Sequence, residues 1–290
     1  MEALDLESLM PLASIPPTDT RALFRPVASE LVALLRSLKP ADWERPTIAG
    51  SWVVRDVVAH VIDVTCRRLS FHRDQLVPPP PSRPITSERE FVDFINGLNA
   101  DWVASSRRLS PRILTDLIDT STIELATFFE GLPGDAPALF GVSWAGEQTS
   151  EGWFDVGREF TELWHHQEQI RLAVGAPSLR DPRFLRAVIE IAVRGLPHAF
   201  RSVDASTGDS LVIAVSGPAG GVWTLVRSAD RWTIHAGEPP NAAVRAGLSD
   251  EAAWRLLFNG LKGEAARSAV HVEGRADLVT PLLAARSIVV

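Results

Sequence analysis

A single cysteine, Cys66, occurs among the 290 residues of the sequence. One cysteine cannot form an intramolecular disulfide, and it cannot build a metal site that needs several thiolate ligands. A bound metal ion would therefore have to be held by histidine, aspartate or glutamate. Lysine is scarce, since only Lys39 and Lys262 occur, and tyrosine is absent. Basic residues are almost all arginine, and this bias, with the frequent alanine and proline, is typical of a GC-rich genome.

Long hydrophobic runs are also absent. No uninterrupted apolar stretch approaches the roughly 18 to 20 residues that a membrane span needs. Residues 1–7 are acidic, whereas a signal peptide begins with basic residues. We therefore expect a cytoplasmic protein without a membrane partner. With 46% hydrophobic and 22% charged residues, the chain can form one large domain or two ordinary ones with cores of their own.

The sequence has no basic surplus. Its net charge is −7, and the charge is unevenly spread. Residues 1–178 carry 16 lysines and arginines against 25 aspartates and glutamates, whereas residues 179–290 carry 13 against 11. Neither part has the excess of positive charge that binding along a phosphate backbone requires, so we do not expect nucleic acid as a partner.

Apolar residues recur at spacings of three and four over residues 1–178, which is the period of amphipathic helices. The helices expected from this pattern cover about 20–38, 51–75, 87–108, 111–130 and 152–174, and Ser51 is the expected N-cap of the second. Residues 78–84 contain five prolines and predict an extended connection. Long amphipathic helices joined by short links predict an up-and-down bundle over residues 1–178.

Residues 179–290 have a different pattern and predict a small α+β domain. After a helix at about 182–200, short strand-like runs are separated by turn residues. The expected strands are 211–215, 222–226, 232–235, 242–246 and 270–272, with helices at 249–257 and 276–285. The predicted fold class is therefore a mixture of α and α/β structure.

One polar stripe on the helix expected at 152–174 could carry chemistry. Its members follow one another at spacings of 4, 3, 4 and 3, which places them on one side of the helix: Asp155, Glu159, Glu162, His166 and Gln169. Glu162 and His166 lie one turn apart and are a ready pair of metal ligands if a third group reaches them from a facing helix. A solvated ion pair without a function has the same spacing.

A third ligand is available on the second helix. His60 lies among Val57, Val58, Val61 and Val64, where an unpaired imidazole would be costly in a dry core. A core histidine with an internal hydrogen-bond partner is the ordinary alternative. If the two helices are neighbours, a metal ion bound by His60, Glu162 and His166 would account for both the polar stripe and the histidine among valines.

Two motifs resemble those of a known family. The run SWVVRDVVAH at 51–60 resembles the W-x-V-R-D-V-x-x-H opening of the DinB-like, mycothiol-dependent maleylpyruvate isomerase family. The run ELWHH at 162–166 resembles the second metal motif of that family, E-x3-H. The resemblance covers the bundle well and the second half loosely. It implies an up-and-down four-helix bundle followed by a domain similar to sterol-carrier proteins.

The resemblance also implies a site. His60, Glu162 and His166 would bind a divalent metal, usually zinc, although the same ligands suit iron(II) or nickel. His165 is a less favourable ligand because it lies about 100° off the stripe. The cosubstrate would be mycothiol or a related low-molecular-weight thiol, which the metal activates as a thiolate for attack on an electrophilic small molecule. Cys66 should point away from the metal, so the sulfur would come from outside.

Other residues of the implied site are less sharply assigned. Arg67 and Arg158 could contact a substrate carboxylate, and Gln169 could orient His166. The sequence departs from the family at Gln169, where an acidic residue is usual, and after Trp254, where an expected arginine is either missing or replaced by Lys262. Lysine cannot form the same bidentate contact. The isomerase reaction, a mycothiol S-transferase, and a non-catalytic metal-binding or small-molecule carrier protein thus remain open, as do a monomer and a homodimer.

Overall fold

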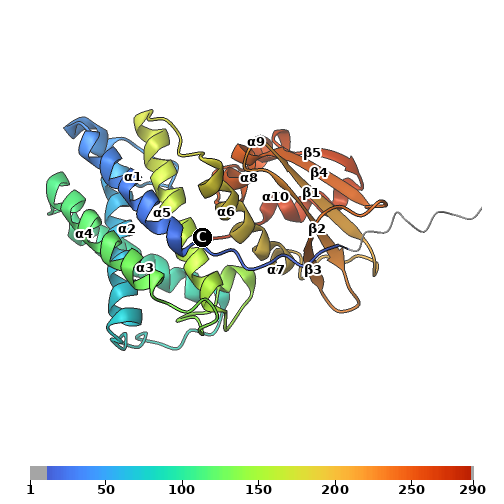
Figure 1. Cartoon of the computed structure of the whole chain (residues 1–290), viewed down its shortest axis with the longest axis horizontal. Coiled ribbons are helices and arrows are strands. Elements are labelled where there is room, and N and C mark those ends of the chain that lie inside the picture. The colour runs from blue at the N-terminus through green and yellow to red at the C-terminus, as the bar shows by residue number, and fades with distance from the viewer. Residues whose placement is uncertain (1–11, 289–290) are drawn as a thin grey trace, which may run out of the picture. The chain divides into compact units, whose positions relative to one another are not determined.

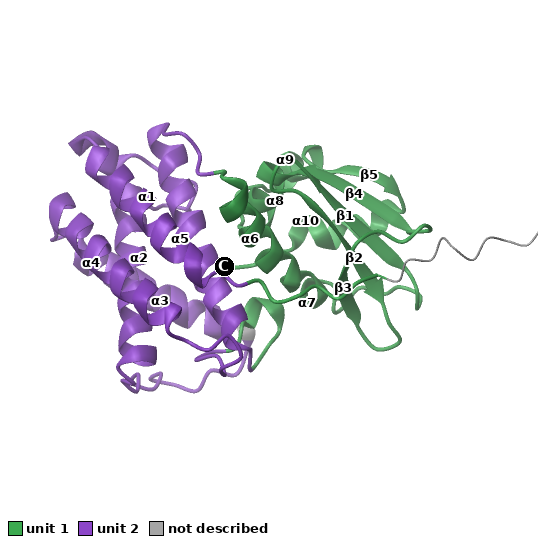
Figure 2. Ribbon diagram, viewed as in Figure 1, with its two compact units in different colours: residues 1–18, 141–148, 180–290 green, residues 19–140, 149–179 purple. Residues whose placement is uncertain are grey.

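The computed structural model describes residues 12–288 (Figure 1). These residues divide into two compact units (Figure 2). The first, which we call the bundle, contains residues 19–140 and 149–179. The second, which we call the sheet unit, contains the described residues of 1–18, 141–148 and 180–290. The acidic residues 1–7 lie outside the described part. Within that part, no helix combines the length and hydropathy needed to cross a membrane.

The bundle contains each helix that the apolar periodicity predicts. The helices are α1 (Phe24–Ser37), α2 (Val54–Arg68), α3 (Glu88–Ser106), α4 (Pro111–Glu130) and α5 (Gly152–Val174). Ser87 and Ser110 cap α3 and α4 with their hydroxyl oxygens. Ser51 was expected to cap α2, but the helix begins later. The backbone N–H of Val53 donates to Asp56 Oδ2 at 3.3 Å, so Val53 is the N-cap.

The ion pairs between helices give their directions. Arg25 near the start of α1 pairs with Glu130 at the end of α4, so these two helices are antiparallel. The contact of Arg68 at the end of α2 with Asp155 at the start of α5 makes that pair antiparallel too. Helices α1, α2, α4 and α5 each pack against two of the others and form a four-helix bundle.

Helix α3 is a fifth helix, packed chiefly against α2. The indole N–H of Trp102 donates to the carbonyl of Ala59 at 2.8 Å, and Arg107 pairs with Asp56 at 3.2 Å. The end of α3 thus lies beside the beginning of α2, so these helices are antiparallel. The chain therefore reverses direction between α2 and α3, and in sequence α3 lies between α2 and α4 of the bundle.

The sheet unit contains a five-stranded sheet in the order β3-β2-β1-β4-β5. Its strands are β1 (Ser210–Ser216), β2 (Gly221–Arg227), β3 (Trp232–Ala236), β4 (Val244–Ser249) and β5 (His271–Gly274). Strands β1 and β4 are parallel, and the other neighbours are antiparallel. Its helices are α6 (Pro182–Ala192), α7 (Leu196–Ala199), α8 (Asp250–Leu257), α9 (Gly263–Ser268) and α10 (Val279–Ala284). The mixed fold class expected from the sequence is confirmed.

Two helices of the sheet unit differ from the expectation. The single helix expected at 182–200 is interrupted by a 3-10 turn, Val193–Gly195, before α7. Pro197 contributes to this break because it has no N–H to continue the hydrogen-bond ladder. Helix α9 was not predicted, since of its six residues only Ala266 is buried and it therefore has no apolar stripe.

Candidate metal site

The polar stripe of α5 faces the interior of the bundle. Asp155, Glu159, His166 and Gln169 are all buried, and Glu162 is partly buried. Polar side chains in such a place need partners, because an unpaired buried charge costs several kcal/mol or more. The alternative interpretation, in which Glu162 and His166 form a solvated ion pair on an exposed edge of the helix, is therefore wrong.

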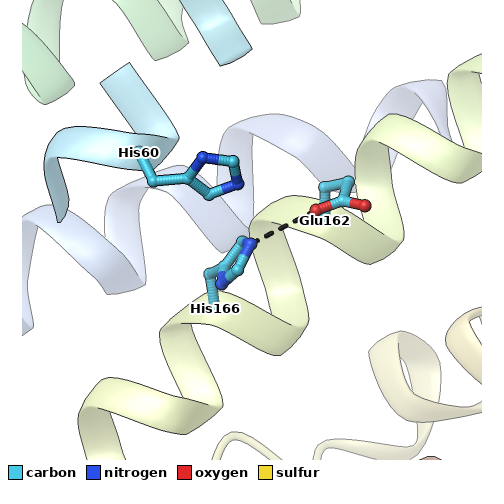
Figure 3. Close-up of side chains that lie close together, drawn as sticks. All are labelled: His60, Glu162 and His166. Atoms are coloured by element: carbon cyan, nitrogen blue, oxygen red, sulfur yellow. Dashed lines mark ion pairs between the residues drawn. The ribbon is translucent and has the colours of Figure 1, made fainter. Parts of the chain in front are cut away.

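His60 on α2 meets this stripe from the facing helix, as Figure 3 shows. His60, Glu162 and His166 each offer one ligand atom, and these three atoms lie within 4.8 Å of one another. His166 Nε2 lies 3.2 Å from Glu162 Oε2, and the rings of His60 and His166 are 4.7 Å apart between centroids. In a tetrahedral zinc site, bonds of about 2.0 to 2.2 Å separate ligand atoms by about 3.4 Å. Small side-chain rotations would therefore bring all three ligand atoms to bonding distance of one common metal ion.

Gln169 fixes the orientation of His166. Gln169 Oε1 lies 2.8 Å from His166 Nδ1. Because a carbonyl oxygen only accepts, Nδ1 carries the hydrogen in this contact. In the neutral form that binds metal, the lone pair of His166 would then be on Nε2, the nitrogen that faces Glu162. A partner on the outer nitrogen of this kind is typical of histidines that bind metal.

The protonation states also suit metal binding. Burial, with the nearby His166, lowers the pKa of His60 to about 3, so its imidazole is neutral at pH 7. Burial opposes ionisation of Glu162, but its hydrogen bond with His166 and the neighbouring histidines hold its pKa below the usual range. A neutral imidazole and an ionised carboxylate are the forms that bind metal. The donor types, their spacing and their charge states therefore fit a divalent cation.

His165, the alternative ligand, lies outside this group. Its Nδ1 contacts the carbonyl of Thr161 at 2.9 Å, and burial lowers its pKa to about 3. Cys66 is likewise not a member. Burial, with the nearby Asp63 and Glu124, raises the pKa of its thiol, which disfavours the reactive thiolate.

A narrow pocket of largely apolar character adjoins the site. Its walls come from α1, α2, α4 and α5 and include Phe24, Val61, Val64, Thr65, Leu125, Glu159, Glu162, Leu163 and His166. The pocket therefore contains two of the three prospective ligands and one further carboxylate, Glu159. Its apolar walls would keep water away from a group bound there.

The two arginines expected to contact substrate are both in ion pairs. Arg67 pairs with Asp63 at 2.9 Å and donates to Asn99 Oδ1 at 3.0 Å. Arg158 Nη2 lies 2.9 Å from Asp155 and 2.7 Å from Glu159. Both arginines nevertheless act on the site electrostatically. After burial and the neighbouring His166, the charge of Arg67 also contributes to the lowered pKa of His60. Burial lowers the pKa of Arg158, but the charges of Glu159, Asp155 and, to a smaller extent, Glu162 outweigh that effect and raise it.

Sequence reasoning missed a buried ion pair next to this site. Arg68 donates to Asp155, and both side chains are almost fully buried. Arg68 continues the apolar series Val57, Val61 and Val64 at spacings of 4, 3 and 4. An arginine at a position where the period requires an apolar residue was the signal that could have identified it.

Comparisons with known proteins concern the family and the fold. A family described as "Mycothiol maleylpyruvate isomerase N-terminal domain" matches residues 24–171. Crystal structures of a mycothiol-dependent maleylpyruvate isomerase and of its histidine-to-alanine mutant both match with a TM-score of 0.55 at 15% sequence identity. Each match covers 89% of this chain and 93% of the other. This likeness shows a shared fold. No curated protein sequence matches the chain.

Proposed function

Since the chain belongs to the mycothiol maleylpyruvate isomerase family, we propose that it is a metal-dependent enzyme that uses a low-molecular-weight thiol. The thiol would be mycothiol or a close relative, and it would attack an electrophilic small molecule. The observation that carries this proposal is the buried group of His60, Glu162 and His166. A reaction that needs free thiol also needs a reducing compartment, so we propose that it takes place in the cytoplasm.

His60, Glu162 and His166 would hold the metal, with zinc the first choice and iron(II) or nickel the alternatives. A divalent cation at this place would lower the pKa of a bound thiol, so that thiolate is available at neutral pH. Two histidines and one carboxylate leave coordination positions for the thiol sulfur. Gln169 would keep the lone pair of His166 directed at the site, and the apolar walls would exclude water.

The thiol must come from outside the chain. Cys66 is the single cysteine, it is not part of the ligand group, and the pKa of its thiol is raised. The thiolate would form a bond to an electrophilic carbon of the substrate. In an isomerase, addition to a cis double bond allows rotation, and elimination then returns the trans product and the thiol. In an S-transferase the carbon–sulfur bond persists and the thiol is consumed.

The ion pairs of the two arginines favour the S-transferase as a second candidate function. Arg67 and Arg158 each have acidic partners, so a substrate with two carboxylates would have to compete with Asp63, Asp155 and Glu159. An electrophile with less negative charge meets no such competition. Contact of either arginine with a substrate carboxylate stays a prediction.

Metal analysis tests the site directly. We expect about one metal ion per chain in the purified protein and a large loss in His60→Ala and His166→Ala, because each variant removes one of three ligands. Cys66→Ser is the matched control and should keep its metal. Full metal occupancy in both histidine variants would refute the proposed site.

Product analysis separates the reactions. The protein is incubated with mycothiol and either maleylpyruvate or an activated aryl halide. Isomerisation without thiol consumption identifies the isomerase, whereas one thiol consumed per product identifies the transferase. A metal-loaded protein that turns over neither substrate would instead support a non-catalytic metal-binding function.

A further inference from the structure

The two histidines of the site are held in different ways. His166 Nδ1 has the amide oxygen of Gln169 as its partner. His60 Nδ1 is buried and has no hydrogen-bond partner among the described residues. A histidine that binds metal usually has a partner on its outer nitrogen, because that contact fixes the orientation of the ring. Some other contact must therefore orient His60.

The contact that the structure offers is the indole of Trp52. The rings of Trp52 and His60 lie 5.0 Å apart between centroids, at an angle of 46°. His60 is also 4.7 Å from the ring of His166, at 79°. Tilted and edge-on aromatic contacts at these distances are favourable. Trp52 and His166 thus both restrict the rotation of the His60 ring.

The backbone of Trp52 is firmly held before α2 begins. Its carbonyl accepts from both the backbone N–H and the hydroxyl of Thr47, at 3.0 and 2.7 Å. Its N–H donates to the carbonyl of Ala49 at 3.1 Å, and Pro46 and Val53 form an antiparallel bridge around this turn. The indole therefore extends from a fixed point.

Helix α3 braces the same region. Asp56, which accepts from the N–H of Val53, is buried and pairs at 3.2 Å with Arg107, the residue that follows α3. Trp102 of α3 donates to the carbonyl of Ala59, the residue before His60. The turn that carries Trp52 and the helix that carries His60 are thus joined to each other and to α3.

We propose that Trp52 is a positioning residue, whose indole holds the His60 imidazole with its ligand nitrogen toward Glu162 and His166. This inference rests on the proposed metal site. It assigns to an aromatic contact on His60 the task that the hydrogen bond to Gln169 performs for His166. The restriction is present before the metal binds, so its loss should weaken metal affinity without removing a ligand.

The test compares Trp52→Ala and Trp52→Phe with the unaltered protein. Zinc affinity is measured by competition with a chromophoric chelator, and the absorption spectrum of the cobalt(II)-loaded protein reports the ligand geometry. Loss of an orienting contact lowers metal affinity by about 10- to 100-fold, and this is the expected effect of Trp52→Ala, with an altered cobalt spectrum. Trp52→Phe keeps a flat ring against His60, so its loss of zinc affinity should be smaller than that of Trp52→Ala.

Trp153→Ala is the matched control. Trp153 is also half-buried in the bundle, but it lies at the start of α5 and stacks on Phe154. Its loss should leave zinc affinity and the cobalt spectrum unchanged. Thermal unfolding of each metal-free variant shows whether it folds. If Trp52→Ala does not fold, Trp52→Leu takes its place, because leucine keeps apolar bulk without a ring.

The outcomes separate the two proposals. If the unaltered protein binds no zinc, the proposed function fails and this inference falls with it. If it binds zinc, and Trp52→Ala or its leucine substitute binds equally well with the same cobalt spectrum, only the role of Trp52 is refuted. Weakened binding in Trp153→Ala of the same size would also overturn it, since the effect would then follow from general loss of packing.

Discussion

Replacing Asp155 with asparagine should destabilise the bundle more than replacing its partner Arg68 with methionine. Asp155 is fully buried, yet its pKa is lowered, because the charges of Arg158 and Arg68 outweigh the effect of burial. Its oxygens accept from Arg68, from Arg158 at 2.9 Å and from the N–H of Leu139 at 3.2 Å. It is therefore an ionised carboxylate with several donors.

The two sides of the pair are not equivalent. Arg68 is 3% exposed, Asp155 is its one carboxylate partner, and its Nε and Nη1 atoms have no hydrogen-bond partner among the described residues. Asp155→Asn thus leaves a buried guanidinium without a counter-charge, which costs about 3 to 5 kcal/mol. After Arg68→Met, Asp155 still has Arg158 and Leu139, so the loss is that of one charge-assisted hydrogen bond, about 1.5 to 3 kcal/mol.

Urea denaturation of both single variants and the double variant at pH 7 tests this reasoning. The double variant contains no unpaired guanidinium at position 68, so its destabilisation should fall short of the sum of the single effects by about 2 kcal/mol. Amide hydrogen exchange in α2 and α5 assigns the change to the bundle. Equal costs for the two single variants, or a double variant that equals their sum, would refute the asymmetry derived from the contacts.

Two further predictions concern the metal site. Gln169→Ala should lower zinc affinity by about 10- to 100-fold, because His166 loses the partner on Nδ1, whereas Gln169→Glu should retain tight binding. Chelator competition measures the zinc affinity of both variants. An unchanged affinity in the alanine variant would contradict the assigned contact. The metal-free protein should lose stability as the pH falls from about 6.5 toward about 3, since His60 and His165 each have a folded pKa of about 3 against 6.5 and the unfolded chain binds more protons in that window. Urea unfolding at several pH values checks this, His60→Gln should flatten part of the slope, and a profile that is level between pH 7 and 5 would be inconsistent with the buried neutral histidines.

The helices of the bundle and the residues of the site were accessible to sequence reasoning because they rest on local spacing. The stripe on α5 and the run around His60 each show a helical period that places their members on one face. That α2 and α5 are neighbours was inferred because a histidine among valines and a polar stripe could satisfy each other, and because the family resemblance implied the same three ligands. The interruption after α6 and the short helix α9 were not predicted, because neither has a repeated apolar pattern in the sequence.

The inserted helix α3 shows what local spacing does not contain. Its own periodicity predicts a helix, but nothing in that pattern says that it packs chiefly against α2. That placement depends on contacts distant in sequence, such as Trp102 with Ala59 and Arg107 with Asp56. The ion pairs of Arg67 with Asp63 and of Arg158 with Asp155 are different, because they join residues four and three apart on one helix. Helical spacing alone allows both pairs.

The charges along the α5 stripe distinguish Glu162 from the other two acids. Asp155 and Glu159 both contact Arg158, and Asp155 also has Arg68, so two acids meet two permanent cations. Within the described residues, the ion-pair partner of Glu162 is His166 rather than an arginine or lysine. A partly buried carboxylate needs a counter-charge. A histidine that binds metal is neutral, so in a loaded site His166 would not be that counter-charge, and the bound cation itself would balance Glu162.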